Sequence, residues 1–216
     1  MGWLLVSGCG SAPTPAEESQ ESVPTVKVMA VGDSITQGSP ALLGGWRAQL
    51  KVWAPNLEFV GSQSDVGLHE GYSGANVSPF GLLYDFALPN VDVYQPELIL
   101  LSVGTNDITG GIEDPEATLA FAELLLARPS VTKVIIGTIP LRTDEEPWIS
   151  DTPVYNAGLL ALDLPAGIYV YPVSGGLVAN DLVDQLHPTQ AGYLKMAAVW
   201  LQAIEAAGVP LGQAND

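Results

Sequence analysis

The sequence has little cysteine, little histidine and little positive charge. Its one cysteine, Cys9, excludes an intrachain disulfide and any zinc or iron–sulfur site built from several cysteines. Lys and Arg number 7 against 24 Asp and Glu, which gives a formal net charge of -17 at pH 7. A surface with that field repels phosphate backbones, so the composition argues against nucleic acid as a partner. No apolar run reaches the length of about 18 residues that a membrane-spanning helix requires.

The sequence does contain enough apolar material for one folded domain. Hydrophobic residues make up 47% of the 216 residues, which excludes a disordered, solvated chain for most of the length. A chain of this size corresponds to one domain, since domains contain roughly 100 to 200 residues. We expect the domain to span residues 25–210 and to follow a flexible segment, residues 1–24.

The first nine residues, MGWLLVSGC, form a short apolar patch that ends in Val6-Ser7-Gly8-Cys9. This tetrapeptide resembles the lipobox of bacterial lipoproteins, in which the cysteine becomes the lipidated first residue of the mature chain. The residues that follow are rich in Ser, Pro and Glu and have the composition of a solvated tether. The resemblance implies an extracytoplasmic protein, secreted or anchored to a bacterial membrane by a lipid on Cys9. The alternative is an unstructured tail with a chance cysteine.

From Val26 onward, apolar runs alternate with amphipathic segments. This alternation is typical of strands that are buried on both faces and joined by crossover helices. The pattern predicts an α/β domain with a five-stranded parallel sheet and helices on both of its faces. The expected strands are Val26–Val31, Leu57–Val60, Leu98–Val103, Val134–Ile139 and Ile168–Val173. The expected helices are Trp46–Trp53, Ser78–Phe86, Pro115–Ala127, Pro153–Leu162 and Pro188–Ala207.

A serine follows the first predicted strand, in Gly32-Asp33-Ser34-Ile35-Thr36. The active site of a parallel α/β sheet lies beyond the carboxyl ends of the strands, so Ser34 stands where a nucleophile is expected. The small Gly32 suits a tight turn that presents the hydroxyl. Ser and Asp are also ordinary turn and helix N-cap residues, and on its own the motif fits that role as well. Thr36 replaces the second glycine of the GxSxG elbow, which argues against an α/β-hydrolase.

Serine needs a base to act as a nucleophile at neutral pH, and the chain offers His69 and His187. His187 lies in Asp184-Gln185-Leu186-His187-Pro188, where a turn before the last predicted helix can bring the Asp184 carboxylate to the imidazole. That carboxylate would hold the ring tautomer and stabilise the imidazolium when Ser34 loses its proton. His69 has Glu70 beside it, but adjacent side chains usually point apart, so we favour His187. The alternative for Asp184 and His187 is a helix cap with a satisfied histidine.

Two further segments supply hydrogen-bond donors. Asn106, in Gly104-Thr105-Asn106-Asp107, carries a side-chain amide at the carboxyl end of the central predicted strand. Gly74, in Gly71-Tyr72-Ser73-Gly74, lets a backbone N–H approach a substrate closely. Together they could form an oxyanion hole for the charge that develops on a carbonyl oxygen in acyl transfer. Each segment alone fits an Asx turn or a glycine turn better.

The blocks GDSIT, YSG with Gly74, GTND and DxxHP occur in this order and resemble the SGNH hydrolase superfamily, also called the GDSL esterases. The resemblance spans Val26 to about Ala207. Three segments, GGWR at 44–47, FVGS at 59–62 and HEGYSG at 69–74, are similar to acetyl xylan esterases of carbohydrate esterase family three. The resemblance implies a three-layer α/β/α, flavodoxin-like fold and ester hydrolysis without a metal or other cofactor. The roles that it implies are nucleophile for Ser34, base for His187, orienting carboxylate for Asp184, and oxyanion donors for Gly74, Asn106 and the Ser34 N–H.

The expected substrate is therefore a small acyl ester, chiefly acetyl, on xylan or a related polysaccharide. Alternatives of the same class are a general short-chain carboxylesterase or arylesterase and, less favoured, a lysophospholipase or thioesterase. An alternative of another class is a lipoprotein that binds a glycan in its cleft without cleaving it. A serine-directed probe would distinguish it from an esterase, because a binding protein would not be labelled at Ser34. Trp148 lies in a polar loop after a predicted strand and is expected to line the cleft, whereas Trp46, Trp53 and Trp200 fit helical core positions.

Overall fold

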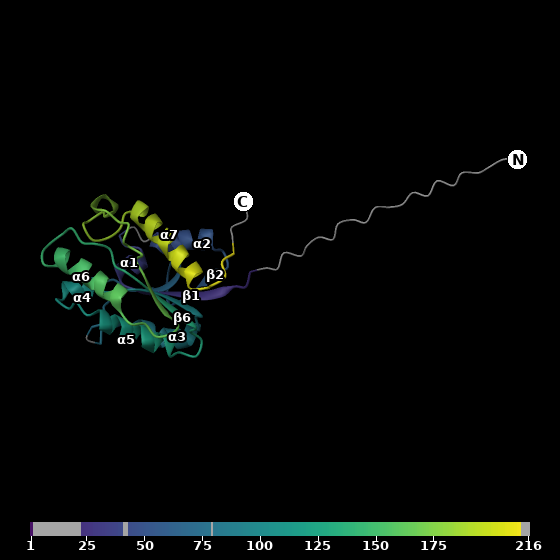
Figure 1. Ribbon diagram of the computed structural model, residues 1–216, viewed down its shortest axis with the longest axis horizontal. Coiled ribbons are helices and arrows are strands. Elements are labelled where there is room, and N and C mark those ends of the chain that lie inside the picture. Colours follow the sequence, from purple (N-terminus) through teal and green to yellow (C-terminus); the bar gives the residue numbers. More distant parts are fainter. Residues whose placement is uncertain (2–22, 41–42, 79, 213–216) are drawn as a thin grey trace.

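The computed structural model describes Met1 and residues 23–40, 43–78 and 80–212. These residues form a mostly parallel β-sheet between layers of helices (Figure 1). Cys9 and residues 2–22 of the predicted tether lie outside the described residues. Within the described ranges, none of the helices is long and apolar enough to cross a bilayer.

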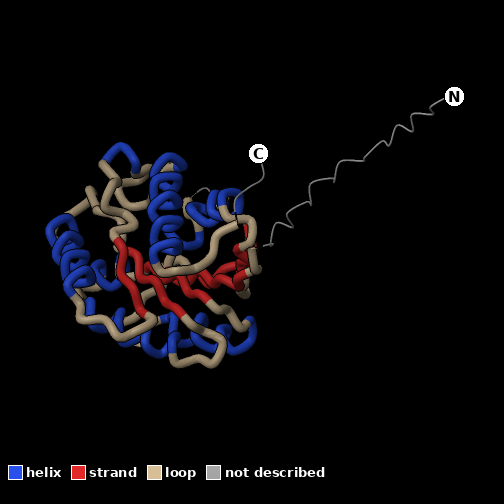
Figure 2. The backbone as a smooth tube through the Cα atoms, turned by 45° about the vertical axis from the view of Figure 1, so that its right-hand side comes forward, coloured by secondary structure: helices blue, strands red, loops and turns tan. Residues whose placement is uncertain are grey.

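The strands lie together as one sheet with helices around it (Figure 2). The strand order is β3-β4-β1-β5-β6-β7, with β2 paired to β1. β2 lies along Val26–Val28 and β4 along Val31–Gly32, so these two strands follow one another on the same edge of β1. On its other edge β1 pairs with β5 over Val28–Gly32. The strands are β1 (Val26–Gly32), β2 (Leu57–Phe59), β3 (Gln63–Asp65), β4 (Gly67–Gly71), β5 (Leu98–Ser102), β6 (Lys133–Gly137) and β7 (Ile168–Tyr171).

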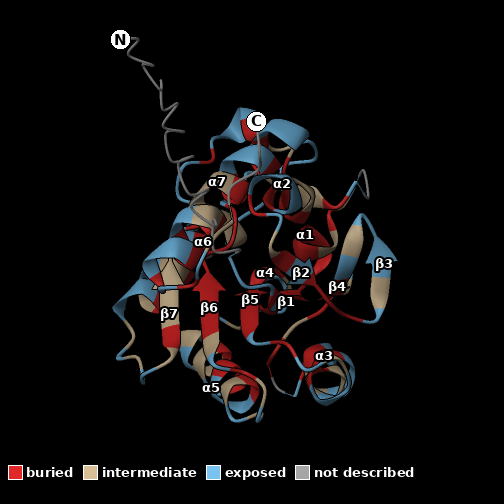
Figure 3. Ribbon diagram, turned by 90° about the vertical axis from the view of Figure 1, so that its right-hand side faces the viewer, coloured by how far each residue is buried: buried red, intermediate tan, exposed pale blue. Residues whose placement is uncertain are grey.

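Helices cover both faces of the sheet (Figure 3). One apolar cluster lies under α2 and α7, and a second lies under α3, α5 and α6. The helices are α1 (Ser34–Gln37), α2 (Gly45–Trp53), α3 (Leu82–Tyr94), α4 (Thr105–Thr109), α5 (Pro115–Leu126), α6 (Trp148–Ala161) and α7 (Gln190–Ala206), and a 3-10 turn, η1, spans Ala179–Asp181.

The central strand β5 contributes to both clusters, because successive side chains of a strand point to opposite faces. Leu98 and Leu100 face the cluster under α2 and α7, whereas Ile99 and Leu101 face the other. Leu100 is completely buried. Replacing such a leucine by alanine removes about 2–5 kcal/mol of stability. The core therefore holds the strand ends, and the loops that follow them, in fixed positions.

The predicted three-layer α/β architecture is confirmed, but within the described residues the sheet has seven strands instead of five, and β3 runs antiparallel to β4. The five predicted strands correspond to β1, β2, β5, β6 and β7. β4 escapes prediction because Gly-Leu-His-Glu-Gly contains no apolar run. Its His69 and Glu70 are nevertheless buried and hydrogen-bonded. Tertiary contacts, and not hydrophobic patterning, place this strand.

The last helix begins two residues later than predicted. α7 starts at Gln190 instead of Pro188. Its N-cap is Thr189, whose hydroxyl accepts the Gly192 backbone N–H at 3.1 Å. Proline is accepted at the first turn but is not required to start a helix, so the cap and not Pro188 fixes the boundary.

Two other helices differ from their predicted bounds because each contains a proline. α3 spans Leu82–Tyr94 rather than residues 78–86 and includes Pro89. α6 begins at Trp148 rather than at residue 153 and includes Pro153. The sequence also does not predict α1 and α4, the short helices that directly follow β1 and β5.

Candidate active site

Ser34 lies at the carboxyl end of β1, as the first residue of the four-residue helix α1. The N-cap is Asp33, whose Oδ1 accepts the Ile35 backbone N–H at 2.9 Å. Before it, a Cβ on Gly32 would stand 2.1 Å from the Ser102 carbonyl oxygen, so this approach of β1 to β5 requires glycine. The local structure therefore presents the Ser34 hydroxyl on a rigid turn.

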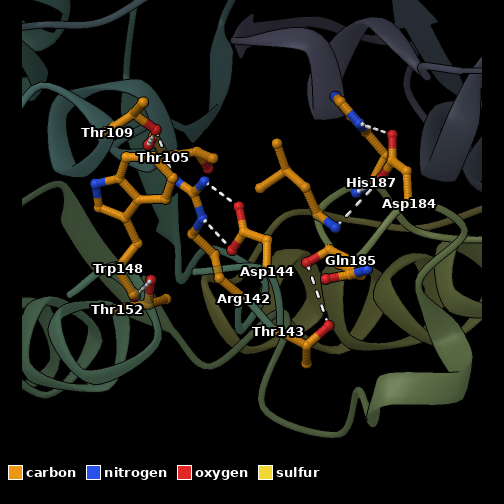
Figure 4. Close-up of polar contacts among 11 residues, drawn as sticks. Thr105, Thr109, Arg142, Thr143, Asp144, Trp148, Thr152, Asp184, Gln185 and His187 are labelled. Carbon is orange, nitrogen blue, oxygen red and sulfur yellow. Dashed lines mark hydrogen bonds and ion pairs between the residues drawn. The ribbon is translucent and has the colours of Figure 1, made fainter. Parts of the chain in front are cut away.

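The structure brings Ser34 together with His187 and Asp184. Ser34 Oγ and His187 Nε2 are 2.9 Å apart, although the two residues are separated by 153 positions in the chain. His187 Nδ1 lies 2.8 Å from Asp184 Oδ2 (Figure 4). Asp184 Oδ1 also accepts the His187 backbone N–H at 2.7 Å, which fixes the carboxylate relative to the ring.

The Asp184 carboxylate is ionised at neutral pH. Partial burial acts to raise the pKa of Asp184, but interactions with His187, chiefly the hydrogen bonds from its backbone and ring, outweigh burial and lower the pKa below its ordinary value. An ionised Asp184 accepts the Nδ1 proton of His187, which leaves Nε2 unprotonated. Nε2 can then accept the hydroxyl proton of Ser34, as general-base chemistry requires.

Asn106 lies in the short helix α4, which follows β5, and Gly74 lies in the loop after β4, so the two residues stand on either side of β1. The Asn106 amide donates from Nδ2 to the Ala75 carbonyl oxygen at 2.8 Å. Gly74, directly before Ala75, has a left-handed backbone (φ 77). Among the described residues other than its two chain neighbours, no heavy atom lies within 4 Å of the place where its Cβ would stand. This hydrogen bond brings the two predicted donors close together. The amide has a second N–H proton that the Ala75 contact does not use.

Asp107 is a site residue to which the sequence assigns no role. Its buried Oδ1 accepts the backbone N–H groups of Val77 at 3.1 Å and Ser78 at 2.7 Å. Burial raises the pKa of Asp107, and these hydrogen bonds oppose the rise. Asp107 and Asn106 together fasten the segment after Gly74 to α4. The GTND block thus positions the loop as well as carrying a candidate donor.

Arg47 is a second residue whose role the sequence does not reveal, although it belongs to the quoted GGWR segment. Its side chain is completely buried, and Nε donates to the Thr36 carbonyl oxygen at 2.9 Å. Nη2 donates to the Gln37 carbonyl oxygen at 3.0 Å and to Asp65 at 2.9 Å. Burial lowers the pKa of Arg47, and Asp65 opposes this. Arg47 therefore fixes the end of α1, the helix that begins with Ser34.

A profile of the GDSL-like Lipase/Acylhydrolase family matches residues 30–195, and this range includes Ser34, Asp184 and His187. The chain belongs to this family. This membership confirms the predicted superfamily and the predicted enzyme class, a carboxylic ester hydrolase. A curated relative, a multidomain esterase from Ruminococcus flavefaciens, is 29% identical over 221 residues and covers 84% of the chain. The chain spans 28% of the length of that relative.

Solved structures share the fold of this GDSL-family chain. A family 3 carbohydrate esterase from Clostridium thermocellum has a TM-score of 0.66 at 23% identity, covering 84% of this chain and 96% of that one. A carbohydrate esterase family 3 protein from Talaromyces cellulolyticus has a TM-score of 0.64 at 24% identity, covering 85% and 99%. An acetylxylan esterase from Geobacillus stearothermophilus has a TM-score of 0.64 at 19% identity, covering 84% and 95%.

The acidic residue of the GDSL-family block, Asp33, is buried directly before the serine. Burial raises the pKa of Asp33 to about 6, against the opposing effect of the hydrogen bond from Ile35. Within the described residues its Oδ2 has no hydrogen-bond partner. A buried carboxylate oxygen without a partner favours the protonated form, so Asp33 changes charge at a mildly acidic pH.

His69 is a buried structural residue in β4. Its Nδ1 accepts the Gly71 backbone N–H at 2.9 Å, and Nε2 lies 3.6 Å from Asp65. Burial and the charge of Arg47 lower the pKa of His69 well below its ordinary value. His69 therefore uses Nδ1 in a hydrogen bond with Gly71 of its own strand. This structural role agrees with the preference for His187 as the base.

The buried carboxylate of Glu70 anchors the segment that leads to Gly74. It accepts hydrogen bonds from the Ser62 backbone N–H, from the Tyr72 hydroxyl and, at 2.9 Å, from the Asn90 side chain. Loss of this buried carboxylate would leave its donors without a hydrogen-bond partner, which costs free energy of folding. Glu70 thereby fixes Tyr72, two residues before Gly74.

Trp148, the predicted cleft residue, begins α6 and packs partly against the core under α3, α5 and α6. The Arg142 guanidinium lies over its ring, 4.3 Å from the centroid (Figure 4). Arg142 also pairs with Asp144 and donates to Thr109 Oγ1 at 2.5 Å. Arg142 thus covers one face of the Trp148 ring, and contact of the other face with a substrate stays a prediction.

A groove of about 520 Å³ lies between α2 and the start of α7. Val183 and Pro188 line it and flank the segment that carries Asp184 and His187, so the groove adjoins the candidate site. Exposed apolar side chains form much of its wall: Leu43, Val52, Val66, Val183 and Leu194. Across the described ranges, no three His, Cys, Asp or Glu side chains come together as a metal site.

Proposed function

We propose that this chain hydrolyses short acyl esters, chiefly acetyl esters on xylan or related carbohydrates, through an acyl-enzyme on Ser34. The observation that carries the proposal is the pair of contacts from Ser34 Oγ to His187 at 2.9 Å and from His187 to Asp184 at 2.8 Å. A serine with a base in reach and a carboxylate behind the base is the arrangement of nucleophilic acyl transfer. The fold of acetylxylan and family 3 carbohydrate esterases supports the substrate class.

In the proposed reaction Ser34 Oγ attacks the ester carbonyl carbon while His187 Nε2 takes the hydroxyl proton. The C–O bond to the alcohol then breaks, and His187 returns the proton to the leaving oxygen. In the second half, His187 takes a proton from water, the hydroxide attacks the acyl-enzyme, and the acid leaves as Ser34 regains its proton. Asp184 keeps the ring tautomer and stabilises the imidazolium in both halves.

The negative charge on the carbonyl oxygen needs fixed donors on the side opposite His187. The Ser34 backbone N–H, the Gly74 backbone N–H and the Asn106 side-chain amide are proposed for this role. The bond from Asn106 to Ala75 and the bonds to Asp107 hold this loop before substrate arrives. Donors that are already oriented stabilise the oxyanion without reorganisation, which is the main source of their effect.

Acetate release from acetylated xylan tests the substrate, measured beside hydrolysis of 4-nitrophenyl acetate, butyrate and octanoate. Wild type, Ser34→Ala and a matched control, Ser130→Ala, are compared. Ser130 lies in the loop before β6, at the amino ends of the parallel strands, whereas Ser34 lies at their carboxyl ends. We expect acetate release by wild type and Ser130→Ala and its loss in Ser34→Ala.

Other outcomes would change the assignment. Cleavage of nitrophenyl esters without release from the polymer would move the function to a general short-chain carboxylesterase. Absence of both activities, with no labelling of Ser34 by a fluorophosphonate, would favour a protein that binds a glycan without cleaving it.

The apolar groove favours a second candidate function, hydrolysis of esters that carry a larger apolar group. Its walls are mostly aliphatic and it adjoins the His187 segment. Apolar walls gain free energy by covering alkyl or aryl carbons, whereas a sugar face needs hydrogen-bond partners. The ratio of activity on octanoate to activity on acetate separates the two candidates.

A further inference from the structure

The segment that carries Asp184 and His187 has few attachments to the rest of the molecule. Internally, the Val183 N–H bonds the His187 carbonyl oxygen at 2.9 Å, and Asp184 Oδ1 accepts nearby backbone N–H groups. In the described part of the chain, the hydrogen bonds that leave residues 183–187 go to Ser34 and to Thr143. Thr143 is therefore the anchor of this segment apart from the nucleophile itself.

The anchored residue is Gln185, between Asp184 and His187. It has a left-handed backbone with φ 69, which is unfavourable for a residue with a Cβ. Its carbonyl oxygen accepts the Thr143 backbone N–H at 3.0 Å. Such a backbone conformation persists only where surrounding contacts enforce it. The Thr143 contact thus acts directly on the turn that determines the positions of the Asp184 carboxylate and the His187 imidazole.

Arg142 holds the backbone on which Thr143 lies. Its side chain is 3% exposed, and its Nε donates to Asp144 Oδ1 at 3.0 Å while Nη2 donates to Oδ2 (Figure 4). This two-point pair spans Thr143, because its partners are the residues on either side. Nη1 donates to Thr109 in α4, and the guanidinium rests on the Trp148 ring. The Thr143 segment is therefore fastened to α4 and α6.

We infer that Arg142 is a positioning residue for the base of this enzyme. Through Thr143 it fixes Gln185, and through Gln185 the orientation of Asp184 and His187. The inference rests on the proposed role of His187 as the base. Displacement of a reacting group by about 1 Å can cost 100-fold in rate, so a loosened turn would lower turnover without removing any group that touches substrate.

The test uses Arg142→Lys, which keeps the charge and loses the planar fork. A lysine cannot bond Asp144 at two points and Thr109 together. We expect kcat for 4-nitrophenyl acetate to fall about 10-fold while KM is nearly unchanged. In the proton NMR spectrum, the downfield His187 Nδ1 resonance should weaken or exchange faster. The matched control is Arg128→Lys, whose arginine pairs with Asp92 at 2.9 Å on the surface, and it should change neither readout.

A folded Arg142→Lys enzyme with wild-type kcat and an unchanged His187 Nδ1 resonance would overturn the inference. If this variant does not fold, hydrogen exchange in the wild type decides. The Thr143 amide should be protected, and exchange at the rate of a free peptide would overturn the inference. Neither NMR readout requires turnover. Lack of esterase activity in the wild type would therefore count against the proposed function, and the role of Arg142 would still be judged by these signals.

Discussion

The side-chain amide of Asn106 donates to the carbonyl oxygen of Ala75, 2.8 Å away, and so joins α4, the short helix after β5, to the loop that carries Gly74. Helix α4 and this loop follow different strands, β5 and β4, which lie on either side of β1. Their junction lies beyond the carboxyl ends of β4 and β5, the two neighbours of the strand that Ser34 follows. The contact therefore couples loop structure to the proposed stabilisation of the oxyanion.

Replacing Asn106 by alanine should lower kcat for 4-nitrophenyl acetate by about 100- to 1000-fold, because one fixed donor to the oxyanion is lost. KM should change much less. The control is Asn56→Ala. The Asn56 side chain donates to the backbone carbonyl oxygens of Pro24 and Pro210, and it lies at the amino ends of the parallel strands, away from the candidate site. Wild-type kcat in a folded Asn106→Ala enzyme would remove Asn106 from the oxyanion hole.

Replacing Asp184 by asparagine should lower kcat by about 100- to 10,000-fold. The amide Nδ2 of asparagine would donate toward His187 Nδ1, which favours the tautomer with its proton on Nε2. That tautomer cannot accept the Ser34 proton. Steady-state kinetics of Asp184→Asn beside Ser34→Ala give the comparison, and we expect the smaller loss for Asp184→Asn. An unchanged rate would reduce the triad to a Ser34–His187 dyad.

The buried Asp33 predicts a pH dependence of stability. Its pKa in the folded protein is about 6, against an ordinary value of 3.8. Between these values the folded protein keeps a proton that the unfolded chain has released, so the contribution of Asp33 to stability is present below pH 3.8 and is lost as the pH rises through 6. Asp33→Asn cannot ionise. Its free energy of unfolding, relative to wild type, should therefore rise by roughly 2 kcal/mol between about pH 4 and pH 7.

Urea unfolding of both proteins at the two pH values measures this difference directly. The substitution also changes hydrogen bonds, but that effect is the same at both pH values and cancels in the comparison. A difference in free energy that is equal at pH 4 and pH 7 would show that Asp33 titrates with an ordinary pKa.

Filling the apolar groove should change the preference for acyl length. Ala48 lines the groove, and Ala48→Phe would occupy part of its volume. If the groove holds the alkyl part of the substrate, kcat/KM for 4-nitrophenyl octanoate should fall roughly 10-fold while that for the acetate stays unchanged. Ala161→Phe, at the end of α6, is the control. An unchanged octanoate-to-acetate ratio in Ala48→Phe would exclude the groove as a substrate site.

Much of the fold, and the three residues Ser34, His187 and Asp184, could be predicted because their sequence signals are local. Strands buried on both faces appear as apolar runs. Ser34 and the block with Asn106 follow predicted strands, and His187 directly precedes the last predicted helix. The structure brings Ser34, His187 and Asp184 within hydrogen-bond distance, as the sequence predicts. Their catalytic roles stay predictions until variants are measured.

The contacts that position these residues could not be predicted, because most of them go to backbone groups. Arg47 bonds the carbonyl oxygens of Thr36 and Gln37, and the Thr143 N–H bonds the carbonyl oxygen of Gln185. Every residue type offers a carbonyl oxygen and all except proline offer an N–H, so no sequence pattern marks these contacts. Arg142 contacts side chains, but those of Thr109 and Trp148 come from other elements of the chain, so the sequence around Arg142 does not reveal them.

The lipid anchor is a separate prediction that rests on the residues around Cys9. Expression of the native gene with a clickable fatty acid would place the label on Cys9 if the anchor exists. Absence of label on a chain that contains Cys9 would contradict it and leave the N-terminal segment as a tail.

Labelling with a fluorophosphonate, followed by mass spectrometry of the peptides, tests the central claim most directly. A serine activated by His187 and Asp184 should react at Ser34 in the wild type, not at all in Ser34→Ala, and about 100- to 10,000-fold more slowly in His187→Ala. Loss of 4-nitrophenyl acetate hydrolysis should follow the loss of label. Label on another residue, or full hydrolysis by Ser34→Ala, would contradict the account.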